Sequence, residues 1–90
     1  MVMDYPVIDP VETGKRIREL RKARKIRVVD LSEYMGFTEP QAVYKWERGE
    51  TLPSLENFYA LCRFFNTQME NIICERGETQ RVSSFFRYRN

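Results

Sequence analysis

The chain has 90 residues, of which 42% are hydrophobic, and a formal net charge of +2 at pH 7. This length allows one domain with a single small core. No apolar run is long enough to cross a bilayer, and the first residues lack a signal-peptide pattern. We therefore expect a soluble, cytoplasmic protein with no membrane association.

The composition argues against catalysis and metal binding. The chain has no histidine, which removes the commonest general acid/base and nucleophile activator. Cys62 and Cys74 are the only cysteines, and two thiols without further ligands do not make a metal site. A glycine-rich phosphate loop is also absent. We expect no enzymatic activity, no metal, no cofactor and no small-molecule ligand.

The charges are unevenly distributed along the chain. Residues 15–27 hold eight cations and one anion, Glu19. Such a run forms either a solvated helix face or a surface for a phosphate backbone. A polar recognition surface beside it would favour the second interpretation.

The N-terminal residues 1–9 form an arm that either packs or is disordered. A first helix starts after Asp9, which can cap it, with Pro10 in its first turn and Glu12 completing a capping box. Its expected inward stripe is Ile17, Leu20 and Ala23, with Val11 or Thr13 one turn earlier. Gly14 inside this helix suggests that another element passes close by.

A second helix is predicted for about residues 28–35 and a third for the segment that ends at Gly49. Gly36 can end the second helix in a left-handed conformation. Thr38 or Glu39 is the expected cap of the third helix, since Thr38 and Gln41 have capping-box spacing. The inward positions of the second helix are Val28, Leu31 and either Met35 or Tyr34.

The third helix has two distinct faces. Val43 and Trp46 are three residues apart and share a face that can be buried. The opposite face carries hydrogen-bonding groups and no carboxylate: Gln41, Tyr44, Lys45 and Arg48. Glutamine can read adenine and lysine or arginine can read guanine, so this face suits the DNA major groove.

Two more helices and a tail complete the predicted chain. Ser54 caps a fourth helix that ends at Asn66, and Thr67 with Glu70 opens a fifth. The inward positions of the fourth helix are Leu55, Phe58, Leu61, Cys62 and Phe65, and those of the fifth are Met69, Ile72 and Ile73. After Gly77 the tail is an appended strand, a partner-binding segment or disordered.

The motifs GKRIRELRKA (residues 14–23), DLSEYMGF (30–37), PQAVYKWERGETLPSLEN (40–57) and TQMENII (67–73) point to a known family. With them the chain resembles the Cro/repressor, or XRE-type, helix-turn-helix DNA-binding domains over about residues 12–74. The resemblance implies an all-α, compact five-helix bundle like the lambda repressor. The domain would span residues 10–76, between the arm (1–9) and the tail (77–90).

The resemblance also implies a function and a set of contacts. The chain would be a small bacterial transcriptional regulator, a repressor, that binds double-stranded DNA as a homodimer. Base contacts would fall on Gln41, Tyr44 and Lys45. Phosphate contacts would fall on Arg21, Thr38, Arg48 and Thr51, and Arg21 would pair with Glu47.

The sequence departs from the family pattern in two places. Nine residues separate Gly36 from Trp46, one more than in the standard motif. The third helix must therefore start later or have a modified first turn, which leaves the contact register open by one residue. Val28 stands where relatives often have a phosphate-binding glutamine, so Arg27 or the N-terminus of the second helix would take over this contact.

A second function comes from a different class. Domains of this type also serve as antitoxins or adaptors, which would dock here through the aromatic tail. The tail residues concerned are Val82, Phe85, Phe86 and Tyr88. A DNA affinity without salt dependence would favour this alternative, because phosphate contacts release counterions.

Overall fold

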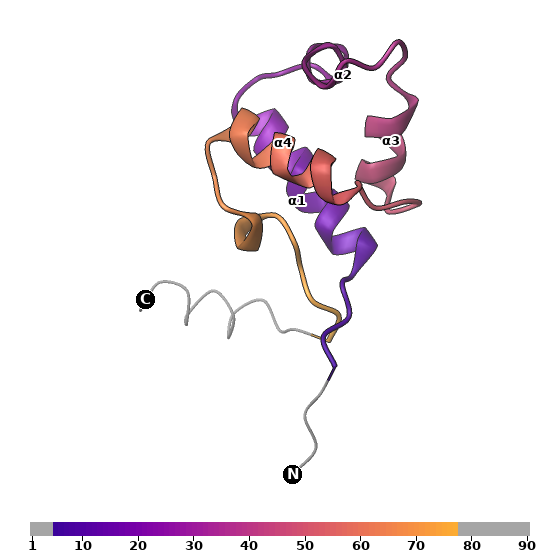
Figure 1. The fold of residues 1–90 in the computed structure, drawn as a ribbon, viewed down its shortest axis with the longest axis vertical. Coiled ribbons are helices and arrows are strands. Elements are labelled where there is room, and N and C mark those ends of the chain that lie inside the picture. Colours follow the sequence, from indigo (N-terminus) through magenta and orange to yellow (C-terminus); the bar gives the residue numbers. More distant parts are fainter. Residues whose placement is uncertain (1–4, 78–90) are drawn as a thin grey trace.

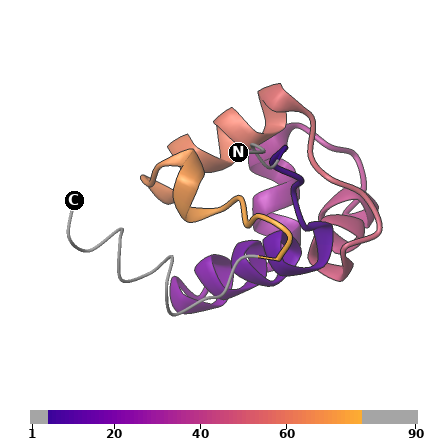
Figure 2. The ribbon, with the colours of Figure 1, turned by 90° about the horizontal axis from the view of Figure 1, so that it is seen from below.

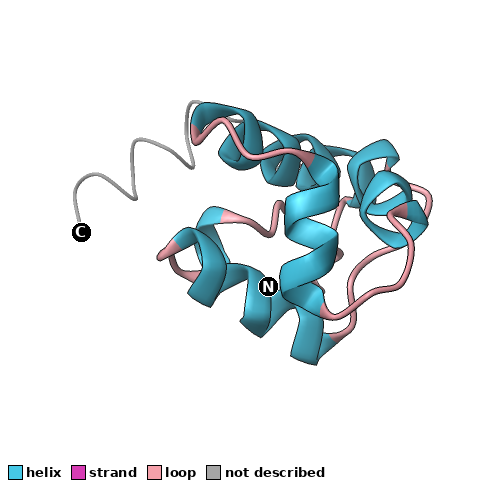
Figure 3. Cartoon of the chain, turned by 90° about the horizontal axis from the view of Figure 1, so that it is seen from above, coloured by secondary structure: helices cyan, strands magenta, loops and turns pink. Residues whose placement is uncertain are grey.

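The computed structural model describes residues 5–77, which form four α-helices and one short 3₁₀ helix (Figure 1). The elements are α1 (Pro10–Ala23), α2 (Val28–Met35), α3 (Gln41–Arg48), α4 (Leu55–Phe65) and η1 (Met69–Asn71). Short loops join them, and within the described range no extended segment is longer than an isolated β-bridge (Figure 3). The all-α prediction is confirmed for this part of the chain. None of the helices in it has the length and apolar character needed to span a bilayer.

Most helix ends follow the local sequence signals. Asp9 Oδ1 accepts hydrogen bonds from the backbone N–H groups of Val11 (3.0 Å) and Glu12 (3.2 Å) at the start of α1. Ser54 Oγ accepts one from Asn57 N–H at the start of α4. Gly36 ends α2 with a left-handed φ of 81°. Side-chain caps and left-handed residues thus fix these ends locally, as predicted.

The start of α3 differs from the prediction. Pro40 is the residue before the helix and no side chain caps it, so both proposed caps, Thr38 and Glu39, are wrong. Residues 37–40 form an irregular turn, and Gln41 is the first helical residue. The additional residue between Gly36 and Trp46 is therefore accommodated in the turn, and the helix starts later.

The core lies between the four helices and includes the chain just after η1. Its buried hydrophobic residues are Ile17, Val28, Leu31, Val43, Trp46, Phe58, Leu61, Phe65 and Ile72. Helix α1 packs mainly on α3, and α2 contacts both α3 and α4. Phe37 from the turn meets the Trp46 ring edge-on, with centroids 5.7 Å apart. The inward stripe of α3 predicted from Val43 and Trp46 is confirmed.

Two predicted inward positions are wrong, and the structure decides between two alternatives at a third. Leu55 is 75% exposed, although it lies one turn ahead of the buried Phe58 on the same face. It is the first residue of α4, at the end of that face. Ala23, at the end of α1, is exposed as well. Between the alternatives in the first turn of α1, Thr13 is buried and Val11 is 49% exposed.

The predicted fifth helix is reduced to the single 3₁₀ turn of η1, so the bundle has four α-helices among its described residues. Thr67 does not cap it; its Oγ1 accepts a hydrogen bond from the Asn71 side chain instead. After η1 the chain extends and pairs with the N-terminal arm. Asp9 N–H donates to Cys74 C=O (2.7 Å), and Arg76 N–H donates to Val7 C=O (2.6 Å).

This pairing holds the two ends of the described chain together. Figure 2 shows the arm and the segment after η1 running side by side near the start of α1. The buried Thr13 Oγ1 accepts a hydrogen bond from Cys74 N–H at 3.0 Å, which ties the segment to α1. These tertiary bonds draw residues 73–76 out of helical conformation. The tail predictions for Val82, Phe85, Phe86 and Tyr88 lie outside the described residues.

Candidate nucleic-acid interface

The outer face of α3 presents four polar side chains to solvent. Gln41, Tyr44, Lys45 and Arg48 are all exposed, and Tyr44 has 45% of its surface accessible. On the opposite face Val43 and Trp46 are buried against the core. The packing of that face therefore fixes which way the polar stripe points. The stripe offers an amide, a phenol, an ammonium and a guanidinium, and no acid.

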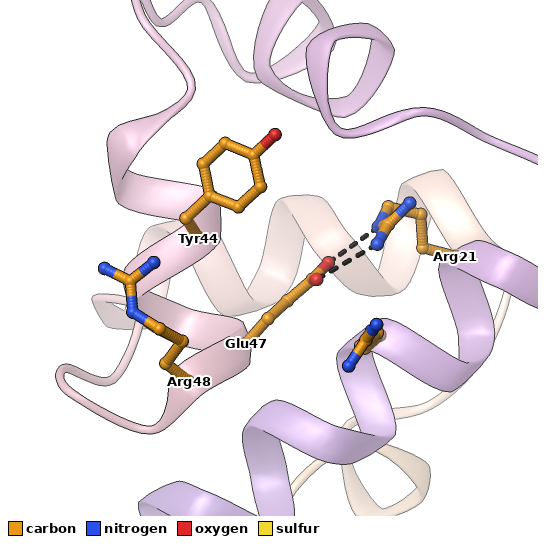
Figure 4. A pocket seen from close by; sticks show the side chains of 5 residues that line it. Arg21, Tyr44, Glu47 and Arg48 are labelled. Atoms are coloured by element: carbon orange, nitrogen blue, oxygen red, sulfur yellow. Dashed lines mark hydrogen bonds and ion pairs between the residues drawn. The ribbon is translucent and has the colours of Figure 1, made fainter.

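Helix α3 is joined to α1 by an ion pair with two hydrogen bonds (Figure 4). Arg21 Nε donates to Glu47 Oε2 at 2.7 Å, and Arg21 Nη2 donates to Glu47 Oε1 at 3.0 Å. The two side chains are only 12% and 7% exposed. A third donor, Arg21 Nη1, bonds the backbone carbonyl of Ile26 at 2.9 Å. The pair suggested by the family resemblance is thus present in the structure.

The Glu47 hydrogen bonds raise the pKa of Arg21 above its ordinary value, which keeps the guanidinium charged. A planar guanidinium held along one edge by both oxygens of a carboxylate, and at its remaining nitrogen by a backbone carbonyl, has little freedom to rotate. The pair therefore sets the angle and distance between α1 and α3. The pair fixes the position of α3 relative to α1 whether or not Arg21 itself contacts a ligand.

A groove of about 270 Å³ opens between α1 and α3 above this ion pair. It is lined by Arg18, Arg21, Tyr44, Glu47 and Arg48. Figure 4 shows Tyr44 and Arg48 projecting from α3 on the side of the groove opposite Arg21. Three arginines against one glutamate make the lining cationic, and Tyr44 and Arg48 belong both to the groove and to the exposed face of α3.

The remaining predicted phosphate-binding residues lie around α3 and α2. Thr38 is exposed in the turn before α3, and Thr51 is exposed in the loop after it. Arg27 precedes α2 and donates twice to Asp30, from Nε (3.0 Å) and Nη2 (2.9 Å). Its charge is therefore partly engaged at the surface.

Arg48 has a similar local partner. Its Nε donates to Glu50 Oε2, and both side chains are at least half exposed. Because surface pairs of this kind contribute little and exchange readily with water, Arg48 remains accessible to an anion. The same bond lowers the pKa of Glu50, so this carboxylate stays ionised beside the groove.

Arg18, which was not among the predicted contact residues, faces the groove from α1. It stood in the cationic run of residues 15–27, but that pattern did not distinguish it from its neighbours. Its spacing of three from Arg21 places the two on one side of the helix, which is the signal that was available. Within residues 5–77 no three histidine, cysteine or acidic side chains come together as a metal site.

Comparison with known proteins places this geometry among DNA-binding folds. A family model described as "Helix-turn-helix" matches residues 17–72. The repressor protein C2 of Salmonella phage P22 is 44% identical over 50 residues, which are 56% of this chain and 23% of that protein. The chain thus spans about a quarter of the length of this relative.

Two solved structures are similar in both sequence and fold. The restriction-modification controller protein C.AhdI from Aeromonas hydrophila has a TM-score of 0.65 and 30% identity, with 71% of this chain and 96% of that chain covered. The P22 c2 repressor, solved in complex with a synthetic operator, has a TM-score of 0.64 and 35% identity, with 73% and 96% covered.

Proposed function

Since the chain belongs to the helix-turn-helix family, we propose that it is a sequence-specific DNA-binding transcriptional regulator, and that it represses by occupying its operator. The P22 c2 repressor was solved on operator DNA, and the controller protein is named for regulation of restriction-modification. The likeness extends over almost all of both solved chains. The proposal transfers DNA binding to this chain and assigns it no catalytic role.

The observation that carries the proposal is the outer face of α3. It is an exposed polar stripe on a helix whose other face is locked into the core. The stripe has the hydrogen-bonding groups that distinguish bases in the major groove, which is wide enough to admit an α-helix. Gln41 and Lys45 are one helical turn apart and would read bases, with Tyr44 between them reaching a base, a thymine methyl group or a phosphate.

Backbone contacts would flank this helix. Thr38 and Thr51 lie before and after α3, so both could donate to phosphate oxygens along one groove. Arg48 and Arg27 would add charge at the edges of the same surface. We further propose that two copies bind a palindromic site, as helix-turn-helix dimers do on half-sites about one helical turn apart.

Substitution of Lys45 tests the assignment of α3. On a site enriched from random DNA, Lys45→Ala should cost about 1–3 kcal/mol of binding free energy and relax the preference at one base pair. On a scrambled duplex the loss should be smaller, because a base contact contributes little to non-specific binding. Equal losses on both duplexes would show that Lys45 contacts phosphate or nothing, and would remove it from the base-reading set.

A further inference from the structure

Arg18 differs from the other arginines around the α1–α3 groove because its charge is unmatched. Arg21 is held by Glu47, and Arg48 donates to Glu50. Within the part of the chain that the structure describes, Arg18 has no hydrogen bond or ion pair, although Arg16 and Lys15 on the same helix both have acidic neighbours. A solvated guanidinium beside a cationic groove is free to bind an anion at no cost in internal contacts.

Arg18 also belongs to two neighbouring depressions. It lines the groove with Tyr44 and Arg48, and it lines a second one, of about 300 Å³, with Lys15, Glu19 and Lys22 on α1. The two depressions therefore meet at this side chain. A continuous path of this kind fits a chain of phosphates better than a single ion, because successive phosphates could lie on both sides of one guanidinium.

The acidic residue of the groove does not oppose this arrangement. Glu47 is 7% exposed and is neutralised by two hydrogen bonds from Arg21. Its carboxylate faces α1 rather than the open side of the groove (Figure 4). The pairing therefore leaves the positive charge of Arg18 uncompensated in a groove that Tyr44 also lines, and the Tyr44 hydroxyl can donate to a phosphate oxygen.

We propose that the α1–α3 groove is a binding site for the DNA backbone, in which Arg18 holds a phosphate and Tyr44 assists, while Arg21 positions α3 through Glu47. This inference rests on the proposed DNA-binding function and adds a residue to it. It gives different roles to two of the arginines of α1: Arg18 contacts DNA, and Arg21 is first a structural residue.

The test compares Arg18→Gln with Arg63→Gln in the full chain. Arg63 is an exposed cation on α4 whose side chain contacts Tyr59 and does not line the groove, so its substitution removes the same charge elsewhere on the surface. Affinity for a selected and for a scrambled duplex is measured by fluorescence anisotropy at several salt concentrations. Denaturant unfolding of each variant provides the control for folding.

Arg18→Gln should weaken both duplexes by the same factor, about tenfold at low salt, and reduce the salt slope by about one phosphate contact. Its unfolding midpoint should match that of the unchanged protein, since Arg18 has no internal partner to lose. Arg18→Lys should retain the slope, and Arg63→Gln should leave both slope and affinity unchanged.

Three results would overturn the inference. In the first, Arg18→Gln binds DNA with the original slope; in the second, Arg63→Gln causes the same loss. In the third, inorganic phosphate at constant ionic strength binds the protein only when Arg18 is present but does not displace DNA, which would assign the groove to a free anion. Failure of the proposed function looks different, because the unchanged, folded protein would then bind no duplex.

Discussion

The backbone of Gly14 lies directly against the end of the Trp46 peptide: a Cβ atom at residue 14 would meet the Trp46 carbonyl oxygen at 2.1 Å. No carbon atom can approach an oxygen to which it is not bonded so closely. The absence of a side chain at this position therefore lets α1 pack on α3 at backbone contact. The close approach puts Arg21 within reach of Glu47, so a glycine in α1 helps to set the position of α3.

Gly14→Ala should consequently destabilise the fold strongly. We expect a loss of about 3 kcal/mol or more in the free energy of unfolding, because the obstructing atom is backbone and cannot rotate away. The control is Gly36→Ala, where a Cβ has no neighbour within 4 Å and only the left-handed φ of 81° opposes it. That change should cost about 1–2 kcal/mol. Urea unfolding of both variants measures the difference, and equal losses would contradict the packing explanation.

Substitution of Glu47 should show how much the Arg21–Glu47 pair contributes to the stability of the fold. Glu47→Ala leaves the Arg21 guanidinium mostly buried without its partner, for which we expect a loss of about 3 kcal/mol. Glu50→Ala removes the surface partner of Arg48 and should leave the unfolding midpoint unchanged. If the two alanine variants unfold alike in denaturant, the Arg21–Glu47 pair does not hold α1 to α3.

Leu55 and Phe58 should respond differently to truncation although both lie on α4. Leu55 is 75% exposed and Phe58 is 5% exposed. Phe58→Ala should cost about 3–5 kcal/mol through lost burial and a cavity, whereas Leu55→Ala should change the stability by less than about 0.5 kcal/mol. Thermal unfolding of the two variants measures this difference in stability. A large loss for Leu55→Ala would mean that its side chain is covered in the folded protein.

Thr13 should matter for its hydroxyl group more than for its size. Its Oγ1 accepts the Cys74 N–H bond in a buried setting, and valine has nearly the same shape without the acceptor. Thr13→Val should therefore cost about 1–3 kcal/mol and accelerate amide exchange at Cys74 and Asp9. Thr13→Ser, which retains the acceptor, is the matched variant. Unchanged exchange in Thr13→Val would show that this bond does not fasten the segment after η1.

Local signals in the sequence were sufficient for the features that depend on neighbouring residues. Asp9 and Ser54 cap their helices, and Val43 and Trp46 are buried as their spacing predicts. Gly14 also indicated that another element passes close to the first helix, but the sequence did not show that this element is α3. Each of these follows from backbone chemistry or periodicity within a few residues.

Features that depend on distant residues were missed. The spacing of Thr67 and Glu70 predicted a fifth helix, but hydrogen bonds to the arm and Thr13 hold the chain after Asn71 in an extended form. These partners are distant in sequence: 61 positions separate Thr13 from Cys74, and the arm precedes Thr13. Arg18 was likewise indistinguishable from its basic neighbours, because its role depends on which cations have tertiary partners.

The most direct test of the proposed function is selection of binding sites from a pool of random duplex DNA, followed by titration of the enriched site at two salt concentrations. We predict a two-fold-symmetric motif whose affinity falls steeply with salt, as a dimer with several phosphate contacts requires. If a folded protein enriches no sequence and shows no salt-dependent binding, DNA recognition by α3 is contradicted, and an interaction module with a protein partner becomes the better account.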